Sequence, residues 1–503
     1  MMNGKRIPAG SGNPSAGAWM GDLLVYIRYS TVNWLKIIAL VIKHGPLDTV
    51  RDLRRYPWIL VLLQVNRLLW RFIRGRRGRY RKATAMVMAD IVAGVIRMMD
   101  DVFFRGERLV IHEDMVPPEI IRAMGLVPFM AELMGILMPM IRPHSVEAYI
   151  DACENAGIPP DICSLPKSTM GLTLMGHLPP ALAVITSNLP CDGGMASYAL
   201  MERELGLPTI RLDIPYRFTD EKAVDYFVGE LKRLIGWLEA RTPGRMDWER
   251  LKNICEERNR MLAFEQELWE LIRIRPAPMA GEPIWLSHMW NFNVTPGSAD
   301  STRTFERIVA MGRQNLEEGV DPVGERYRAL LWNPPTIHFI DIYNWAEKAY
   351  GVSLIMDSMT FNRIEPIDTG TPESMLRGLA KTIMNGPMAR HTRGPAENYV
   401  NDIFHITRQF DIDMIWVAGH IGCKNTQALN GMLRELCRRE GIPLLIIHYD
   451  LSDPRIVSRE GIIEQIDHFM ENIMKARRLP LGGDRGMAKG RKDLTVLGQK
   501  EAV

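Results

Sequence analysis

The sequence predicts an α/β protein that contains two copies of a parallel-sheet domain. Strand-like apolar runs alternate with stretches of helical periodicity through most of the chain, which is the pattern of α/β units. Two segments far apart in the chain repeat the same order of strand, cysteine, helix and strand. A length of 503 residues with 47% hydrophobic and 24% charged residues is typical of a globular protein with two or three domains.

The first 85 residues form a basic extension, for which we expect a helical structure. Residues 1–82 contain sixteen Lys or Arg and three Asp, a net charge of +13; the whole chain carries +3, so the remainder carries −10. From Trp19 to Lys82 apolar positions alternate with basic ones, as in amphipathic helices, and the run Arg71 to Lys82 indicates a solvated basic linker. We favour packing of this arm on a partner or on the protein's own acidic body, and expect no nucleic-acid partner. A peripheral contact with anionic lipid is the alternative.

No segment of the extension is expected to cross a membrane. Its longest apolar runs, Ile37 to Ile42 and Trp58 to Val65, are shorter than the roughly 20 residues that a bilayer requires. The first 20 residues lack the apolar stretch of a signal peptide. We therefore expect a cytoplasmic protein whose cysteines are reduced.

Beyond the extension, the alternation of periods divides the chain into four parts. We expect a first α/β domain at 86–218, a mainly helical connector at 219–327, a second α/β domain at 328–476 and a disordered tail at 477–503. The turn residues of WNFNVTPGSADS, within the connector, predict a surface or interdomain loop. The predicted strands are Ala181–Thr186, Thr209–Asp213, Thr336–Ile340, Ser353–Met356, Met414–Val417 and Pro443–His448.

The two repeated segments each deliver a cysteine from the end of a strand to the start of a helix. In the first, the strand ALAVITS leads to Cys191; in the second, the strand DMIWVAG leads to Cys423. A Gly-x-Pro sequence closes each helix before the next strand. Open α/β sheets bind ligands at this position, so we expect both cysteines near a binding crevice.

The six cysteines divide into three candidate ligands and three core residues. Besides Cys191 and Cys423, Cys163 lies in a proline-flanked loop, where a packed thiol is unusual. At Cys191 and Cys423 we expect the positive end of the adjacent helix to lower the thiol pKa and favour the metal-binding thiolate. The remaining three lie in helix-like stretches and are interpreted as core residues: Cys153, Cys255 and Cys437.

Three thiolates suit zinc, with His420 as a fourth ligand, or an iron-sulfur cluster, and spacing alone leaves both open. Several other sites are excluded, because the chain has no GxxxxGKS or GxxxxGKT phosphate loop, no GxGxxG after a strand, no HExxH and no GxSxG. The protein therefore does not hydrolyse ATP through a phosphate loop.

Several sequence blocks resemble the family of 2-hydroxyacyl-CoA dehydratases and benzoyl-CoA reductases. They run from Glu113 to Met474 and comprise HEDMVPPEIIRAMGLVPF, ICSLPKSTMG, LPCDGG with RLDIPY, HIGCKNTQ and EGIPLLIIHYDLSDPRIVSREGIIEQIDHFMENI. The resemblance implies two flavodoxin-like domains and a 4Fe-4S cluster held by Cys163, Cys191 and Cys423. It also implies an acyl-CoA thioester substrate, a sister subunit of the same family and a separate ATP-dependent activator that supplies electrons.

The activity that the resemblance implies is one-electron reduction of a CoA thioester at low potential, either for dehydration or for ring reduction, in an oxygen-sensitive enzyme of an anaerobic host. Two alternatives remain: an electron-transfer or double-cluster relative, with Cys153 as a fourth thiolate, and a non-catalytic partner subunit. His420 and Ser164 are tentative catalytic residues, and Lys167 or Lys424 could contact the cluster or coenzyme phosphates if they are not solvated charges. Asp192 and Asp357 are interpreted as helix caps.

Overall fold

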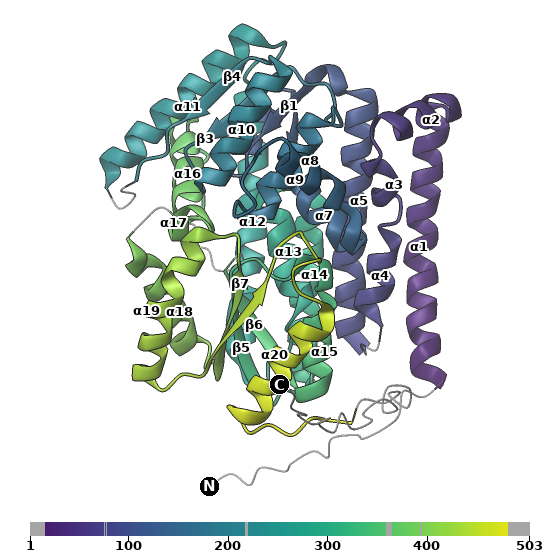
Figure 1. Cartoon of the computed structure of the whole chain (residues 1–503), viewed down its shortest axis with the longest axis vertical. Helices are drawn as coiled ribbons and strands as arrows, with labels where there is room; N and C mark the ends of the chain where they lie inside the picture. The colour runs from purple at the N-terminus through teal and green to yellow at the C-terminus, as the bar shows by residue number, and fades with distance from the viewer. Residues whose placement is uncertain are drawn as a thin grey trace, which may run out of the picture.

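The computed structural model describes residues 16–74, 76, 78–216, 220–358, 365–392 and 395–480, and it contains two parallel sheets of four strands within these residues (Figure 1). The first sheet has the order β2-β1-β3-β4 and the second β6-β5-β7-β8. Because the two orders are the same, the prediction of a duplicated α/β domain is confirmed. The strands are β1 (Leu109–His112), β2 (Val127–Met130), β3 (Ala183–Ser187), β4 (Thr209–Leu212), β5 (Tyr327–Trp332), β6 (Val352–Asp357), β7 (Met414–His420) and β8 (Leu444–Tyr449).

Five of the six predicted strands are present, but the one predicted at Thr336–Ile340 is wrong. That segment contains a short 3-10 helix, Ile337–Phe339, and the strand lies earlier, at β5. Asn333 has a positive φ of 70° and is followed by two prolines, which cannot continue a strand. The sequence analysis also missed β1 and β2, each of which has four residues.

Helices surround both sheets and form the connector between them (Figure 1). The connector is helical, as predicted, and consists of α11 (Glu221–Arg241), α12 (Trp248–Arg273), α13 (Glu282–Asn293) and α14 (Ala299–Glu317). The first domain contributes α6 (Pro118–Ala123), α7 (Met134–Ile141), α8 (Glu147–Asn155), α9 (Ser164–Leu174) and α10 (Asp192–Leu205). The second contributes α15 (Asp341–Tyr350), α16 (Pro372–Asn385), α17 (Ala389–Thr392), α18 (Ala396–Gln409), α19 (Lys424–Glu440) and α20 (Arg459–Asn472).

The connector loop after Trp290 takes the interdomain position, one of the two positions that its turn residues predict. Trp290 is buried against α5, where a Cβ on Gly94 would lie within 3.1 Å of three atoms of the indole ring. The carbonyl groups of Val294 and Pro296 accept hydrogen bonds from the Arg122 guanidinium. The loop therefore packs against the first domain through its backbone as well as its side chains.

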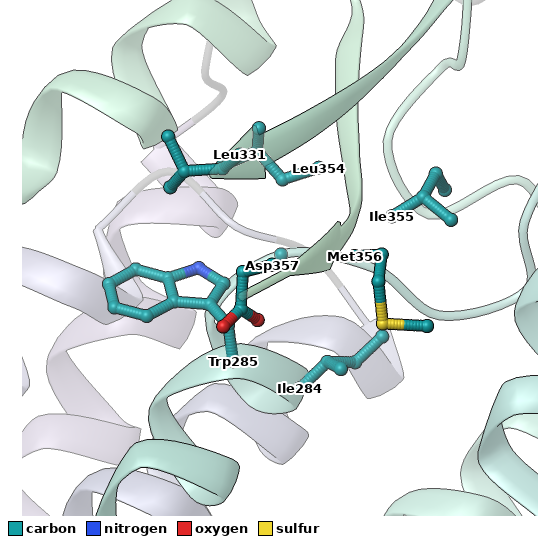
Figure 2. Close-up of a pocket in the computed structure, with 8 residues that line it drawn as sticks. Ile284, Trp285, Leu331, Leu354, Ile355, Met356 and Asp357 are labelled. Carbon is teal, nitrogen blue, oxygen red and sulfur yellow. The ribbon is translucent and has the colours of Figure 1, made fainter. Parts of the chain in front are cut away.

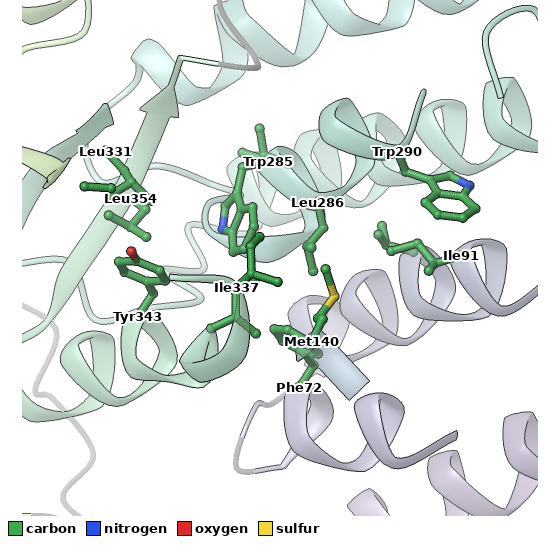
Figure 3. Close-up of a cluster of buried hydrophobic side chains, with 14 of the residues drawn as sticks. Phe72, Ile91, Met140, Trp285, Leu286, Trp290, Leu331, Ile337, Tyr343 and Leu354 are labelled. Atoms are coloured by element: carbon green, nitrogen blue, oxygen red, sulfur yellow. The ribbon is translucent and has the colours of Figure 1, made fainter. Parts of the chain in front are cut away.

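The N-terminal extension is helical, as predicted, and packs on the rest of the chain. It comprises α1 (Ala16–His44), α2 (Pro46–Arg55), α3 (Trp58–Leu62), α4 (Asn66–Ile73) and the first part of α5 (Gly78–Phe104), which continues past the expected domain boundary at residue 85. Figure 3 shows Phe72 of α4 and Ile91 of α5 in one apolar cluster with Trp285 of the connector and Tyr343 of the second domain. One core therefore joins the arm, the connector and the second sheet.

The run Arg71 to Lys82 is not the solvated linker that its composition indicates. The Arg76 guanidinium is fully buried and donates to both carboxylate oxygens of Glu347, each at 2.9 Å. Arg79 pairs with Glu318 at 2.6 Å, and Arg81 with Asp22 at 2.9 Å. The favoured interpretation, packing of the basic arm on the protein's own acidic body, is confirmed.

The buried ion pair between Arg76 and Glu347 is expected to stabilise the folded chain. We expect Glu347→Gln to lower the free energy of unfolding by about 3 kcal/mol, because loss of one partner leaves a buried charge uncompensated. The matched control is Glu318→Gln, which breaks a half-exposed pair of the same arm and should cost no more than about 1 kcal/mol. Urea denaturation of both variants measures the difference; equal costs would contradict the prediction.

Helix α1 revises the expectation that no part of the extension is long and apolar enough to span a bilayer. An 18-residue window within Met20–His44 has a mean hydropathy of 1.3, so this stretch meets both criteria by length and composition alone. Lys36 interrupts the apolar runs in the sequence, but the helix continues through it.

The disordered tail expected at 477–503 lies mostly outside the described residues, because residues 481–503 are not described. Within the described part, the N–H of Leu479 donates a hydrogen bond to the carbonyl of Ala349.

Candidate functional site

The candidate site lies at the carboxyl ends of the strands of both sheets. Cys191 follows β3, and His420 and Cys423 follow or end β7. In each sheet the strand order reverses beside these strands, between β1 and β3 and between β5 and β7. Parallel α/β sheets bind ligands at this switch point, so the prediction of a crevice beside the two cysteines agrees with the topology.

All three predicted ligand cysteines are the residues that precede the first turn of a helix. Cys163 is the N-cap of α9, Cys191 of α10 and Cys423 of α19. The charges of Cys191 and Cys423 act on the thiol of Cys163 and raise its pKa further, so the three side chains lie near one another. A Cβ on Gly422 would stand 2.8 Å from the Cα of Cys163, which shows how closely the loops of the two domains approach.

The expectation that the helix end lowers the thiol pKa is wrong for Cys191, and Cys163, for which no such expectation was made, also has a raised pKa. Burial raises the pKa of Cys163 well above its usual value, and the backbone N–H of Leu165 only partly opposes this effect. Burial likewise raises the pKa of Cys191 to about 11, against the backbone N–H groups of Gly193 and Gly194. Both thiols are therefore protonated at neutral pH and lose their protons when they bind a metal.

His420 connects two parts of the site. Its Nδ1 accepts a hydrogen bond from the backbone N–H of Leu451 at 3.0 Å. Its Nε2 therefore carries the proton and donates to Cys163 Sγ, also at 3.0 Å. Burial lowers the pKa of the imidazole and favours this neutral form, although the Asp450 carboxylate opposes the shift. The His420 imidazole is therefore hydrogen-bonded both to the sulfur of Cys163 and to the backbone of Leu451.

Ser164 and the two lysines have defined partners. The hydroxyl of Ser164 accepts a hydrogen bond from the N–H of Ser452, 3.1 Å away in the second domain. Lys167 is buried and donates to Glu154 at 2.5 Å and to the carbonyl of Pro160 at 2.9 Å, so it is neither a solvated charge nor a free phosphate ligand. Lys424 is exposed and pairs with Asp161 at 2.9 Å.

The two aspartates interpreted as caps do not cap described helices. Asp192 is the first residue of α10, after the N-cap Cys191, and Thr371 is the N-cap of α16, the helix that follows Asp357. Asp357 ends β6 and lines a narrow apolar recess with Trp285 and Met356 (Figure 2). The recess is too narrow for a water molecule, so it is a packing defect rather than a substrate pocket.

The three remaining cysteines are buried in helices, as interpreted from the sequence. Cys153 of α8 donates to the sulfur of Met170 at 3.8 Å, Cys255 packs in the core of the first domain and Cys437 in the larger core. The contact with Met170 places Cys153 in the packing of α8 against α9.

A group of three carboxyl side chains, of which Glu113 and Glu132 are buried and Asp114 is partly buried, lies near Cys191 and was not predicted from the sequence. Glu113 and Asp114 directly follow β1, and Glu132 lies two residues after β2. Burial and the Asp114 carboxylate raise the pKa of Glu132 to about 8, and burial raises that of Asp114 to about 7. The sequence signal for these residues was the position of Glu113 and Asp114 directly after β1, because residues directly after a strand lie at the edge of the sheet.

Glu132 is the member of this group that faces the cysteines. Its Oε1 and the Sγ of Cys191 lie 3.8 and 3.9 Å from the position that a Cβ would occupy on Gly194. Its charge also raises the pKa of Cys191. Glu113, by contrast, accepts a hydrogen bond at 2.7 Å from the N–H of Ser187 and so fixes the end of β3. A neutral carboxyl group therefore stands beside a candidate ligand cysteine.

The same chain matches a known family over most of its length. Residues 115–473 match the sequence model of the family described as 2-hydroxyglutaryl-CoA dehydratase, D-component. The chain belongs to this family. The match agrees with the resemblance over Glu113 to Met474 and leaves the helical arm outside it.

Two characterised relatives show how widely the family varies. One subunit of the benzoyl-CoA reductase of Thauera aromatica is 23% identical over 426 residues, which cover 79% of this chain and 96% of the relative. The alpha subunit of the lactoyl-CoA dehydratase of Anaerotignum propionicum is 22% identical over 394 residues, which cover 70% of this chain and 88% of the relative. Both relatives are subunits of larger enzymes, so the family shows that this chain is a subunit of the same general kind.

Proposed function

We propose that the chain is the iron-sulfur subunit of an acyl-CoA enzyme and holds a 4Fe-4S cluster through Cys163, Cys191 and Cys423. One observation carries the proposal: three helix N-cap cysteines from both domains converge at the switch point of two parallel sheets. Thiolates are the ligands of iron-sulfur clusters, and each of these would be stabilised by the N–H groups of a helix end.

The resemblance of the cysteine-bearing sequence blocks to the dehydratase and reductase family favours a cluster over a single ion. Among the residues that the structure describes, no three His, Cys, Asp or Glu side chains are arranged to hold one metal ion. A four-iron cluster is much larger than an ion and spaces its thiolates more widely. When bound by three thiolates, such a cluster supplies an electron at low potential and an iron open to a thioester carbonyl.

The surrounding residues have complementary roles in this proposal. His420 donates a hydrogen bond to the sulfur of Cys163 and thereby favours its thiolate. Glu132 is neutral at pH 7 and holds a proton on a carboxyl oxygen beside Cys191, where it can give that proton to a departing or reduced oxygen of the substrate. Ser164 joins the two domains through Ser452. The proposed substrate is an acyl-CoA thioester.

We also propose a sister subunit of the same family and a separate ATP-dependent electron donor. Support comes from the relatives, which are both named as subunits, and from the absence of a phosphate loop in the sequence. One relative is a reductase subunit and the other a dehydratase subunit, so anaerobic assays with aromatic and 2-hydroxyacyl-CoA thioesters decide the reaction.

The proposal is tested by metal analysis of the full chain after anaerobic purification. We expect about four iron and four sulfide per chain, together with an electron paramagnetic resonance signal after reduction. Stoichiometric zinc with little iron would overturn the proposal. An enlarged cluster, or one with four thiolate ligands, would instead favour the double-cluster or electron-transfer alternative.

A further inference from the structure

The outer face of α1 is mainly apolar. Figure 1 shows α1 at the edge of the molecule, outside α4 and α5. Successive helical residues are separated by about 100°, and seven of the eight exposed large apolar residues described in α1 fall within one arc about 100° wide and about 34 Å long, which also contains the exposed Thr31. The eighth, Val32, lies about 60° beyond this arc. The seven are 45% to 70% exposed: Met20, Leu24, Ile27, Trp34, Leu35, Ile38 and Ile42. We call this set the apolar stripe of α1.

The charges beside the apolar stripe are basic. Arg28, Lys36 and Lys43 are exposed on one flank, between the stripe and the buried face. The one acidic residue of α1, Asp22, is buried and pairs with Arg81. The exposed face of α1 therefore combines apolar and cationic side chains; of the three cations, Lys43 pairs with Asp100 of α5 at 2.7 Å.

Helix α2 adds exposed apolar and basic residues, together with one exposed ion pair. Leu47 is 87% exposed, the largest exposed fraction of any large apolar side chain in the described residues, and Val50 is 47% exposed. Arg54 and Arg55 are exposed beside them, whereas Arg51 pairs with Asp48 at 2.8 Å. An anionic bilayer surface is complementary to this combination of side chains. Apolar residues insert at the boundary of its acyl chains, and basic residues are attracted to its anionic head groups.

The inner face of α1 holds the helix on the body and excludes a transmembrane position. Asn33 donates to Asn66 of α4 at 2.8 Å, and Tyr26 makes an edge contact with Trp70. Ile37 and Leu40 are buried in the main core. Spanning a bilayer would break these polar and apolar contacts, whereas lying on its surface leaves them intact.

We propose that α1 docks this subunit on the surface of an anionic lipid membrane, with the apolar stripe in the interface and the adjacent basic residues at the head groups. A protein partner is less favoured, since it would need one continuous apolar groove of this length bordered by acidic residues. The proposal is independent of the cluster and of the reaction, because no residue of the arm belongs to the candidate site.

The test is flotation of the full chain with vesicles of phosphatidylcholine alone and of an equimolar mixture of phosphatidylcholine and phosphatidylglycerol. We expect binding to the anionic vesicles only, and weaker binding at higher salt. The double variant Arg28→Gln/Lys36→Gln should bind about 25-fold more weakly, because each basic residue near an anionic surface contributes about fivefold. The triple variant Leu24→Gln/Leu35→Gln/Ile38→Gln should abolish binding.

The matched control is Ile274→Gln/Met432→Gln/Ile456→Gln, which removes three exposed apolar residues outside the arm and should bind like the unmodified chain. Equal binding by the control and the apolar-stripe variant, equal binding to neutral vesicles, or no binding at all would each overturn the proposal. Sedimentation velocity of the same proteins covers the remaining outcome. Self-association that the apolar-stripe variant abolishes, without vesicle binding, would assign the surface to a protein contact instead.

Discussion

Replacing Cys191 with Ser is expected to lower the iron bound per chain from about four atoms to fewer than about two. Turnover should fall by more than the roughly 100-fold that loss of an outer-shell partner of a metal costs. The reason is chemical, since a serine hydroxyl at this helix end is a harder ligand with a far higher pKa than a thiol. Iron and sulfide analysis and anaerobic acyl-CoA assays measure the two effects.

The same result is expected for Cys163→Ser and Cys423→Ser, because all three cysteines precede helices that meet at the site. The matched control is Cys437→Ala, which removes a buried thiol in the middle of the core and should keep the full iron content. Retention of iron in all three serine variants would contradict these cysteines as the cluster ligands, and retention of the complex's activity would favour the non-catalytic partner subunit.

The sequence could predict most of the strands because their apolar runs are long or bounded by turn residues. Strand prediction failed where a strand is very short or where neighbouring residues favour another structure. Ile337 and Phe339 look like a strand in sequence, but the two prolines before Thr336 start a 3-10 turn whose side chains pack into the core. The strands β1 and β2 are only four residues long, too short for a periodicity signal.

The candidate site could be predicted only as far as local sequence determines it. A cysteine between a strand and a helix is visible in sequence, so Cys191 and Cys423 could be placed at a sheet edge before the structure was known. The pKa of Cys191 could not be predicted, because burial of the thiol outweighs the effect of the helix end. Composition indicated solvated charges at Arg76 and Lys167, but both are buried. Arg76 pairs with Glu347, which is 271 residues away in sequence, and Lys167 pairs with Glu154.

Glu132 escaped prediction for the same reason, and it gives the second large expected effect. Glu132→Gln keeps the size and polarity of the side chain but removes its exchangeable carboxyl proton. We expect turnover to fall by about 10²-fold or more, the usual cost of losing a general acid, with iron content unchanged. Iron analysis and anaerobic turnover on the same preparation separate this loss from loss of the cluster.

The pH profile makes the role of Glu132 specific. Burial and the Asp114 carboxylate raise its pKa to about 8, so the proton-bearing form prevails below pH 8 and is lost above it. Turnover of the unmodified enzyme should therefore fall about tenfold per pH unit above 8, and this limb should disappear in Glu132→Gln. Glu113→Gln is the matched control: Glu113 is also buried, but its carboxylate accepts the N–H of Ser187, a contact that the amide oxygen of Gln keeps. Similar losses in both variants, or an unchanged pH limb in Glu132→Gln, would show that this buried group maintains structure and moves no proton.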